Sequence, residues 1–174
     1  VESGATPVPV DVQPDSASID TRAIEAALSD RTRAVMPVHL YGIPADLTSI
    51  QPRLTARGIA VIHDAAQAHG ARYSSGERVG ALGTCTAFSF YPTKNLGALG
   101  DAGCVTTPDP ELAALLRSLR SYGQGESKYD HVRLGVNSRL DPLQARFLSL
   151  HLARLEQWNG RRQEIAEKYL AALG

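Results

Sequence analysis

Short apolar runs separated by amphipathic stretches dominate the hydrophobic pattern of this chain. Each run has the length of a buried strand. The four runs occupy 32–40, 59–63, 84–90 and 103–107. Between the first two, apolar residues at 47, 50 and 54 predict a helix, and this order of strand, helix and strand predicts a right-handed parallel crossover. The pattern therefore indicates an α/β fold, with a mostly parallel sheet flanked by helices.

Polar and proline residues indicate where the helices begin. Asp20 can cap a helix extending to Ser29. The next helix should start only near Ser49, because Pro52 conflicts with a regular helix interior. A third helix begins at 108–110, and we interpret the leucines on one of its faces as packing residues. They are Leu112, Leu115, Leu116 and Leu119.

The last part of the chain predicts a long helix that follows a functional loop. The loop, 122–137, is polar, contains glycines, and is longer than a simple connection needs. Asp141 caps the helix with Pro142 at its first position, and Gly160 is expected to break or bend it. Its apolar stripe consists of Leu143, Phe147, Leu148, Leu152 and Leu155.

Composition and charge are those of an ordinary soluble protein. The net charge is zero and 43% of the 174 residues are hydrophobic. No basic patch indicates nucleic acid, no apolar run could span a bilayer, and the first residues do not resemble a signal peptide. Cys85 and Cys104 lie in strand-like segments without CxxC spacing, which predicts buried free thiols in a reducing cytoplasm. We predict no metal site.

One of the three lysines has unusual surroundings. Lys94 follows the apolar run 84–90 and lies in a loop of small residues, whereas Lys128 and Lys168 lie in polar segments. A lysine in a dehydrated site can form a Schiff base with an aldehyde or ketone. Taken alone, Lys94 is better explained as a surface lysine in a loop.

A second polar residue changes that balance. Asp64 directly follows the apolar run 59–63, and the carboxyl ends of central strands are where open α/β sheets bind ligands. Pyridoxal 5'-phosphate (PLP) requires a lysine for its aldehyde and an acid for its pyridinium nitrogen. Lys94 and Asp64 can supply both. The alternative for Asp64 is the N-cap of a helix, which would need neither Gln67 nor the lysine strand nearby.

Three motifs in this order resemble the DegT-type nucleotide-sugar aminotransferases, which are fold type I PLP enzymes. The motifs are DAAQAHGA at 64–71, SFYPTKNLG at 89–97 and GVNSRLD at 135–141, and the resemblance extends from about Val35 to the C-terminus. It implies that the chain is the central part of the large PLP-binding domain. Members run to about twice this length. We therefore expect a fragment, with 1–140 in that domain and 141–174 as a long helix leading toward an absent C-terminal domain.

The resemblance also implies roles for the cofactor-binding residues. Lys94 binds the aldehyde and then moves a proton, while Asp64 pairs with the pyridinium nitrogen. Gln67 hydrogen-bonds the phenolic oxygen, or is only a polar helix residue. Ser89 binds the phosphate, or is only a core hydroxyl. Asn137 reaches the phosphate of a neighbouring subunit, which implies a homodimer with shared active sites, or is only a turn residue.

Other residues near the motifs have open alternatives. Arg139 binds phosphate or substrate, or pairs with Asp141. Tyr91 lines the sugar pocket, or only packs. His39 and His69 flank the site, and we assign them no catalytic role.

The activity implied by the resemblance is transfer of an amino group, with L-glutamate as the expected donor, to a keto group of a nucleotide-linked deoxysugar. Segment 90–103 looks most like members that act on dTDP-3-keto-6-deoxyhexoses. The first alternative is a dehydratase-like or regulatory member of the same fold, although dehydratase-like relatives have histidine in place of Lys94. A further alternative is a non-enzymatic α/β fragment in which Asp64 and Lys94 are a cap and a surface charge.

Overall fold

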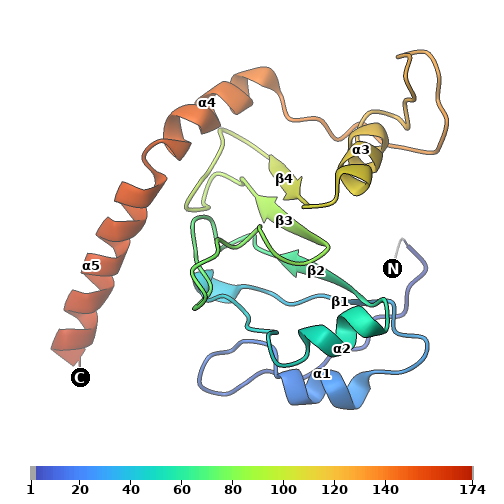
Figure 1. Ribbon diagram of the computed structural model, residues 1–174. Helices are drawn as coiled ribbons and strands as arrows, with labels where there is room; N and C mark the ends of the chain where they lie inside the picture. Colours follow the sequence, from blue (N-terminus) through green and yellow to red (C-terminus); the bar gives the residue numbers. More distant parts are fainter. Residues whose placement is uncertain (1–2, 174) are drawn as a thin grey trace.

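A four-stranded sheet organises the protein, for which a computed structural model describes residues 3–173. The strands are β1 (Ala34–Val35), β2 (Ala60–Asp64), β3 (Cys85–Ser89) and β4 (Gly103–Thr106), in that spatial order (Figure 1). The first three are parallel, and β4 pairs antiparallel with β3. The mostly parallel α/β fold is therefore confirmed.

The register brings two strand ends and one strand start to the same edge of the sheet. Asp64, the last residue of β2, is opposite Ala87 of β3. Ser89, the last residue of β3, is opposite Gly103, the first residue of β4. The loops that follow β2 and β3 therefore leave the sheet side by side.

Helices α1 (Thr21–Ala27) and α2 (Gln51–Ala56) lie beside the β1 end of the sheet (Figure 1). They form the first core cluster, in which Ile24 of α1 and Leu54 of α2 pack with Val61 of β2. The Asp20 carboxylate accepts a hydrogen bond from the Arg22 amide, so the predicted N-cap of α1 is confirmed.

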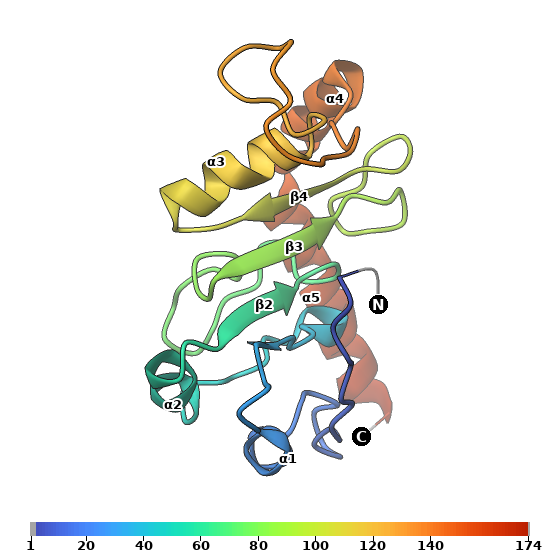
Figure 2. The same ribbon diagram turned by 90° about the vertical axis from the view of Figure 1, so that its right-hand side faces the viewer.

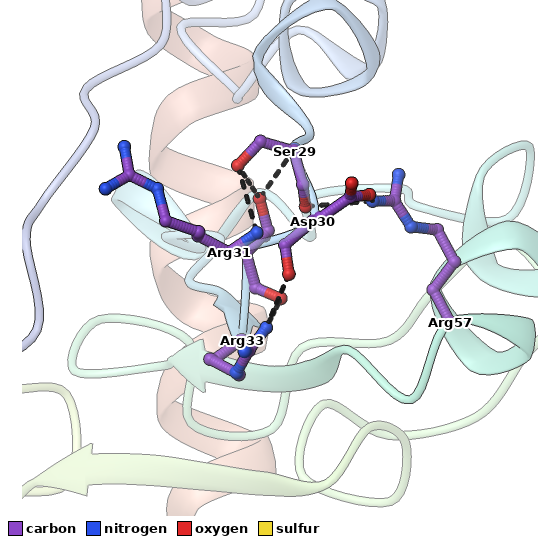
Figure 3. Close-up of polar contacts among 6 residues, drawn as sticks. Ser29, Asp30, Arg31, Arg33 and Arg57 are labelled. Carbon is purple, nitrogen blue, oxygen red and sulfur yellow. Dashed lines mark hydrogen bonds and ion pairs between the residues drawn. The ribbon is translucent and has the colours of Figure 1, made fainter.

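An arginine holds the two helices of this layer together. Arg57 Nη2, at the end of α2, donates to the Ser29 carbonyl oxygen at 2.8 Å and reaches the Asp30 carboxylate at 3.5 Å (Figure 3). Arg33 donates to the Asp30 carbonyl oxygen at 2.8 Å. These contacts fix the turn between α1 and β1.

The expected strand 32–40 is much shorter in the structure. Regular pairing is limited to Ala34–Val35, because Pro37 has no amide hydrogen to continue the ladder. Pairing resumes in a single bridge between Val38 and Asp64. Helix α2 begins at Gln51, with Pro52 in its first turn, close to the start expected near Ser49.

The C-terminal helix is divided, and Gly160 does not divide it. Helix α4 (Pro142–Leu152) ends at Leu152 with Ala153 as its C-cap, and α5 (Leu155–Leu173) continues through Gly160. A single glycine costs a helix only about 1 kcal/mol. The break lies where Leu155 turns into the same core cluster as Leu148. Asp141 caps α4 as predicted, accepting from the Leu143 amide.

Several apolar residues predicted to be buried are exposed in this chain. On α4, Leu143 is 80% exposed and Leu152 58% exposed. Helix α3 (Pro110–Leu119) lies beside β4 and buries none of its residues fully, so its leucines pack only in part. All four residues of β4 are exposed, and the prediction of a buried thiol is wrong for Cys104; Cys85 is half-buried.

Helix α5 runs alongside the sheet, from the level of β4 to that of α1 (Figures 1 and 2). Its N-terminal end contacts the loop after β3, where Leu155 packs with Leu96 and Ala98. None of the helices within residues 3–173 combines the length and the hydrophobicity that a bilayer crossing requires.

Candidate active site

Asp64 ends β2 at the edge where the two loops leave the sheet. Its amide donates to the Pro37 carbonyl oxygen and its carbonyl accepts from the His39 amide, both at 2.9 Å. Its half-buried side chain accepts through Oδ1 from the Ala66 amide at 3.0 Å. Turns and not a helix follow, so the alternative of a helix N-cap is wrong. Within the described chain, Oδ2 accepts no hydrogen bond and is free for a ligand.

A tight loop after β3 carries Lys94. The Lys94 amide donates to the Tyr91 carbonyl oxygen at 2.9 Å, and the Ala98 amide donates to that of Phe90 at 2.7 Å. A Cβ atom at Gly97 would lie 2.5 Å from the Pro92 carbonyl oxygen, so the loop closes only with glycine there. Lys94 is half-buried, and its Nζ has no hydrogen bond or ion pair among residues 3–173.

Ser89 and Gln67 lie in the segments that surround this edge. Ser89 Oγ, at the end of β3, accepts from the Tyr91 amide at 3.2 Å, and Tyr91 itself is 49% exposed. Gln67 is exposed, and its Oε1 accepts from the Tyr41 amide at 2.8 Å. Both side chains therefore use an acceptor locally and keep their hydrogen-bond donors available.

Asn137 and Arg139 are exposed residues of the loop that connects α3 to α4. Arg139 Nε donates to Asn137 Oδ1 at 3.0 Å, and the guanidinium lies 5.5 Å from the centre of the Tyr122 ring. The alternative pairing of Arg139 with Asp141 is not found among residues 3–173, and Asp141 caps α4 through Oδ1. The chain thus brings together the ends of β2 and β3, whereas the backbone of Asn137 pairs with Ser121 just after α3.

Buried histidines behind Asp64 were missed as a group by sequence reasoning. His39 Nδ1 accepts from the Ala45 amide at 2.8 Å, so His39 carries its proton on Nε2 and donates to His63 Nδ1 at 2.9 Å. The Tyr73 hydroxyl lies 3.3 Å from His39 Nε2. The only available sequence signal is that His39 and His63 follow the apolar parts of two neighbouring predicted strands.

Burial determines the protonation of this group. It lowers the pKa of His39 to about 4, with a smaller contribution from His63, while the Asp64 charge opposes the shift. Burial also lowers the pKa of His63 and raises that of Tyr73 to about 12. At neutral pH both imidazoles and the phenol are therefore uncharged.

The strand edge fits the two groups that PLP needs. Among residues 3–173, it presents a half-buried amine without a partner on the loop after β3, and a carboxylate with one free oxygen at the end of β2. Two surface hollows of the described chain lie elsewhere, one along α5 at Arg154 and Trp158 and one at Ile19 and Pro44.

Comparison with known proteins identifies relatives over nearly the whole chain. Over 171 residues it is 52% identical to dTDP-3-amino-3,4,6-trideoxy-alpha-D-glucose transaminase of Streptomyces venezuelae. The matched region covers 98% of this chain and 45% of that protein. Over 170 residues it is 49% identical to the erythromycin biosynthesis sensory transduction protein EryC1 of Saccharopolyspora erythraea, covering 98% of this chain and 46% of that protein. The chain thus spans less than half the length of these curated relatives.

The fold agrees with a solved structure. The crystal structure of S. venezuelae DesV in complex with a ketimine intermediate matches with a TM-score of 0.95 at 51% sequence identity, covering 99% of this chain and 46% of that one. The model of the DegT/DnrJ/EryC1/StrS aminotransferase family matches residues 1–174. Because the family model matches all 174 residues of the chain and the fold is shared with a relative, this chain belongs to the DegT/DnrJ/EryC1/StrS aminotransferase family.

Proposed function

We propose that the protein is a PLP-dependent aminotransferase that moves an amino group from L-glutamate to a keto group of a nucleotide-linked deoxysugar. One observation carries the proposal: Asp64 and the loop of Lys94 leave neighbouring parallel strands at the same edge, in a chain of an aminotransferase family. The proposal extends to a longer protein, in which 1–140 is part of the PLP-binding domain and 141–174 leads toward a C-terminal domain.

Two residues would hold the ends of the cofactor. When bound, PLP supplies an aldehyde that binds amines and a ring that withdraws electrons. Lys94 Nζ would bind the aldehyde carbon and would then serve as the base that carries a proton to and from the substrate carbon. The carboxylate of Asp64, with its free oxygen, keeps the ring nitrogen protonated.

The local hydrogen bonds orient the donors of two further residues. Ser89 Oγ accepts from a backbone amide, so its hydroxyl proton is free to donate to the phosphate. Gln67 Oε1 is occupied by the Tyr41 amide, which leaves the side-chain NH2 group to donate to the phenolic oxygen. Both proposed roles need a donor, and a donor is what each side chain retains.

A second subunit would complete the site. Asn137 and Arg139 are exposed in the loop after α3, so their side chains are accessible to a neighbouring copy. Asn137 would bind the neighbour's phosphate and Arg139 its substrate, in a homodimer with shared sites. Tyr91, half of whose surface is exposed, would line the sugar pocket.

The expected substrate is a dTDP-3-keto-6-deoxyhexose. The name of the S. venezuelae relative, a dTDP-3-amino-3,4,6-trideoxy-alpha-D-glucose transaminase, supports this class. An enzyme of nucleotide-sugar biosynthesis is also consistent with the proposed cytoplasmic location.

Absorbance spectra of the protein at the full length of its relatives test the proposal. PLP bound to Lys94 should give a visible absorbance band, and L-glutamate should remove the band by converting the cofactor to its amine form. Lys94→Ala should abolish both effects. Lys168→Ala, which changes an exposed lysine of α5, should abolish neither. An unchanged spectrum in Lys94→Ala contradicts the proposal.

The name of one relative favours a second candidate, a regulatory protein of the same fold. EryC1 is named a sensory transduction protein. A regulatory protein would show the absorbance of bound PLP but no spectral change with L-glutamate or other amino donors. The same titration therefore separates the two functions.

A further inference from the structure

A partly buried polar cluster connects the lysine loop to α5. It consists of His69 from the loop after β2, Asn95 next to Lys94, and Asn159 of α5. The side-chain nitrogens of both asparagines donate to the His69 carbonyl oxygen at 2.9 Å. Asn95 Nδ2 also lies 3.2 Å from Asn159 Oδ1, and Asn95 Oδ1 lies 2.7 Å from His69 Nδ1. Three separate segments thus meet in one hydrogen-bonded group.

The hydrogen bonds define the tautomer of His69. Because Asn95 Nδ2 faces two acceptors, Asn95 Oδ1 must face the imidazole. His69 Nδ1 must then carry the proton that Oδ1 accepts. His69 is 4% exposed, and its Nε2 is buried without a partner in the described chain. The cluster therefore holds a neutral imidazole in a single orientation.

Packing leaves the cluster little freedom to move. The His69 ring contacts Phe88 and Phe90, with centroid distances of 5.3 and 5.7 Å. A Cβ atom at Gly70 would lie 3.1 Å from Asn159 Nδ2, which shows how closely α5 approaches this loop. Leu155, one turn before Asn159, is buried against the lysine loop.

Charge also favours the neutral imidazole. Burial lowers the pKa of His69, and the nearby positive charge of Lys94 lowers it further, while hydrogen bonding by Asn95 opposes the shift. A neutral ring places no second positive charge beside the amine. His69 can therefore support the lysine loop without repelling Lys94.

We propose that His69, Asn95 and Asn159 are positioning residues that hold Lys94 in place and make α5 the outer support of its loop. The proposal rests on the proposed function, since it deepens the role of Lys94. Asn95 is adjacent to Lys94, and Asn159 anchors Asn95 and His69 to α5. Displacement of the first turns of α5 would thus alter the position of the amine.

A matched pair of variants tests the cluster in the full-length protein. Asn159→Asp keeps the size of the side chain but replaces the donor to the His69 carbonyl oxygen by a repelling oxygen. Gln157→Glu introduces the same charge at an exposed position two residues earlier. Reductive methylation of the protein without PLP, resolved by mass spectrometry, measures the access of reagent to each lysine.

Loosening the loop should increase access to Lys94. Losing this hydrogen bond raises the open population about tenfold, so methylation of Lys94 should accelerate about tenfold in Asn159→Asp while Lys168 is unaffected. Gln157→Glu should leave both rates unchanged. Equal rates at Lys94 in Asn159→Asp and Gln157→Glu would overturn the proposal.

Two further measurements separate the possible failures. Nitrogen NMR of the His69 ring at neutral pH should show the Nδ1–H tautomer in the unaltered protein, and the Nε2–H tautomer or a charged ring would overturn the proposal.

Attachment of PLP to Lys94 should slow in Asn159→Asp. If unaltered protein binds no PLP, the proposed function fails, while methylation and NMR still decide whether the cluster holds the lysine. Should Asn159→Asp fail to fold, Asn159→Ala removes the bonds of Asn159 to Asn95 and to the His69 carbonyl oxygen, and alanine favours the helix.

Discussion

The imidazoles of His39 and His63 are joined by a 2.9 Å hydrogen bond from Nε2 to Nδ1, with ring planes inclined by only 11°. His39 has no exposed surface, and its Nδ1 is occupied by a backbone amide. Neither ring can gain a proton without losing one of these bonds. The pair therefore makes the stability of the sheet edge depend on pH.

Acid should destabilise the protein through His39. Its pKa is about 4 in the folded protein and 6.5 when unperturbed, so the unfolded chain binds more protons between these values. The free energy of unfolding should fall as pH drops from 6.5 to about 4. Below about pH 4, His39 should cause no further decrease. The loss is on the order of 3 kcal/mol. Denaturant unfolding at a series of pH values measures the slope.

His39→Asn provides the comparison, because asparagine can still accept from the Ala45 amide but does not titrate. The slope between pH 6.5 and 4 should decrease in this variant. His131→Asn, which changes an exposed histidine, should keep the slope of the unaltered protein. Equal slopes in His39→Asn and the unaltered protein would contradict the role of the buried pair.

Gly83 should be far less tolerant of alanine than Gly58. Both have positive φ, +81° and +62°, so both substitutions strain the backbone. A Cβ atom at Gly83 would also lie 2.5 Å from the His63 ring, whereas none of the described atoms lies within 4 Å of one at Gly58. Gly83→Ala should cost roughly 1–3 kcal/mol more than Gly58→Ala. Equal midpoints of chemical unfolding would show that the ring moves freely.

The core beneath α2 should depend on Leu54. Its side chain is completely buried among residues of α1 and β2. Leu54→Ala should lower the free energy of unfolding by about 2–5 kcal/mol. Leu152→Ala removes the same atoms from a residue that is 58% exposed and should cost far less. Urea denaturation of the two variants in parallel checks the difference.

Ser89 should contribute to PLP binding through its hydroxyl. Ser89→Ala removes the donor proposed for the phosphate, and a charge-assisted bond contributes about 1.5–3 kcal/mol. The dissociation constant for PLP should rise by roughly 10- to 100-fold. Ser149→Ala removes a hydroxyl that bonds within α4 and should leave it unchanged. Titration of the full-length variants with PLP, followed by absorbance, decides whether the phosphate role holds.

Local signals in the sequence predicted the order of strands and helices well. Apolar runs reflect burial on both faces of a parallel sheet, and the caps at Asp20 and Asp141 act within one helical turn. The same pattern predicted that Asp64 lies at the carboxyl end of a central strand. These features depend on residues that are close together in the chain.

Features that depend on distant partners could not be predicted. Asn95 and Asn159 are 64 positions apart, and nothing local indicates that their side chains meet. The division between α4 and α5 depends on the packing of Leu148 and Leu155, so Gly160 was the wrong choice. The exposure of Cys104 follows from the position of β4 at the margin of the sheet.

The antiparallel strand β4 has a practical consequence for handling the protein. Its side away from β3 has no strand partner in the described chain, so its backbone amides and carbonyls can pair with another molecule. Preparations limited to these residues would be prone to self-association through this strand. Intermolecular β-sheets between copies would then cause the protein to aggregate as it is concentrated.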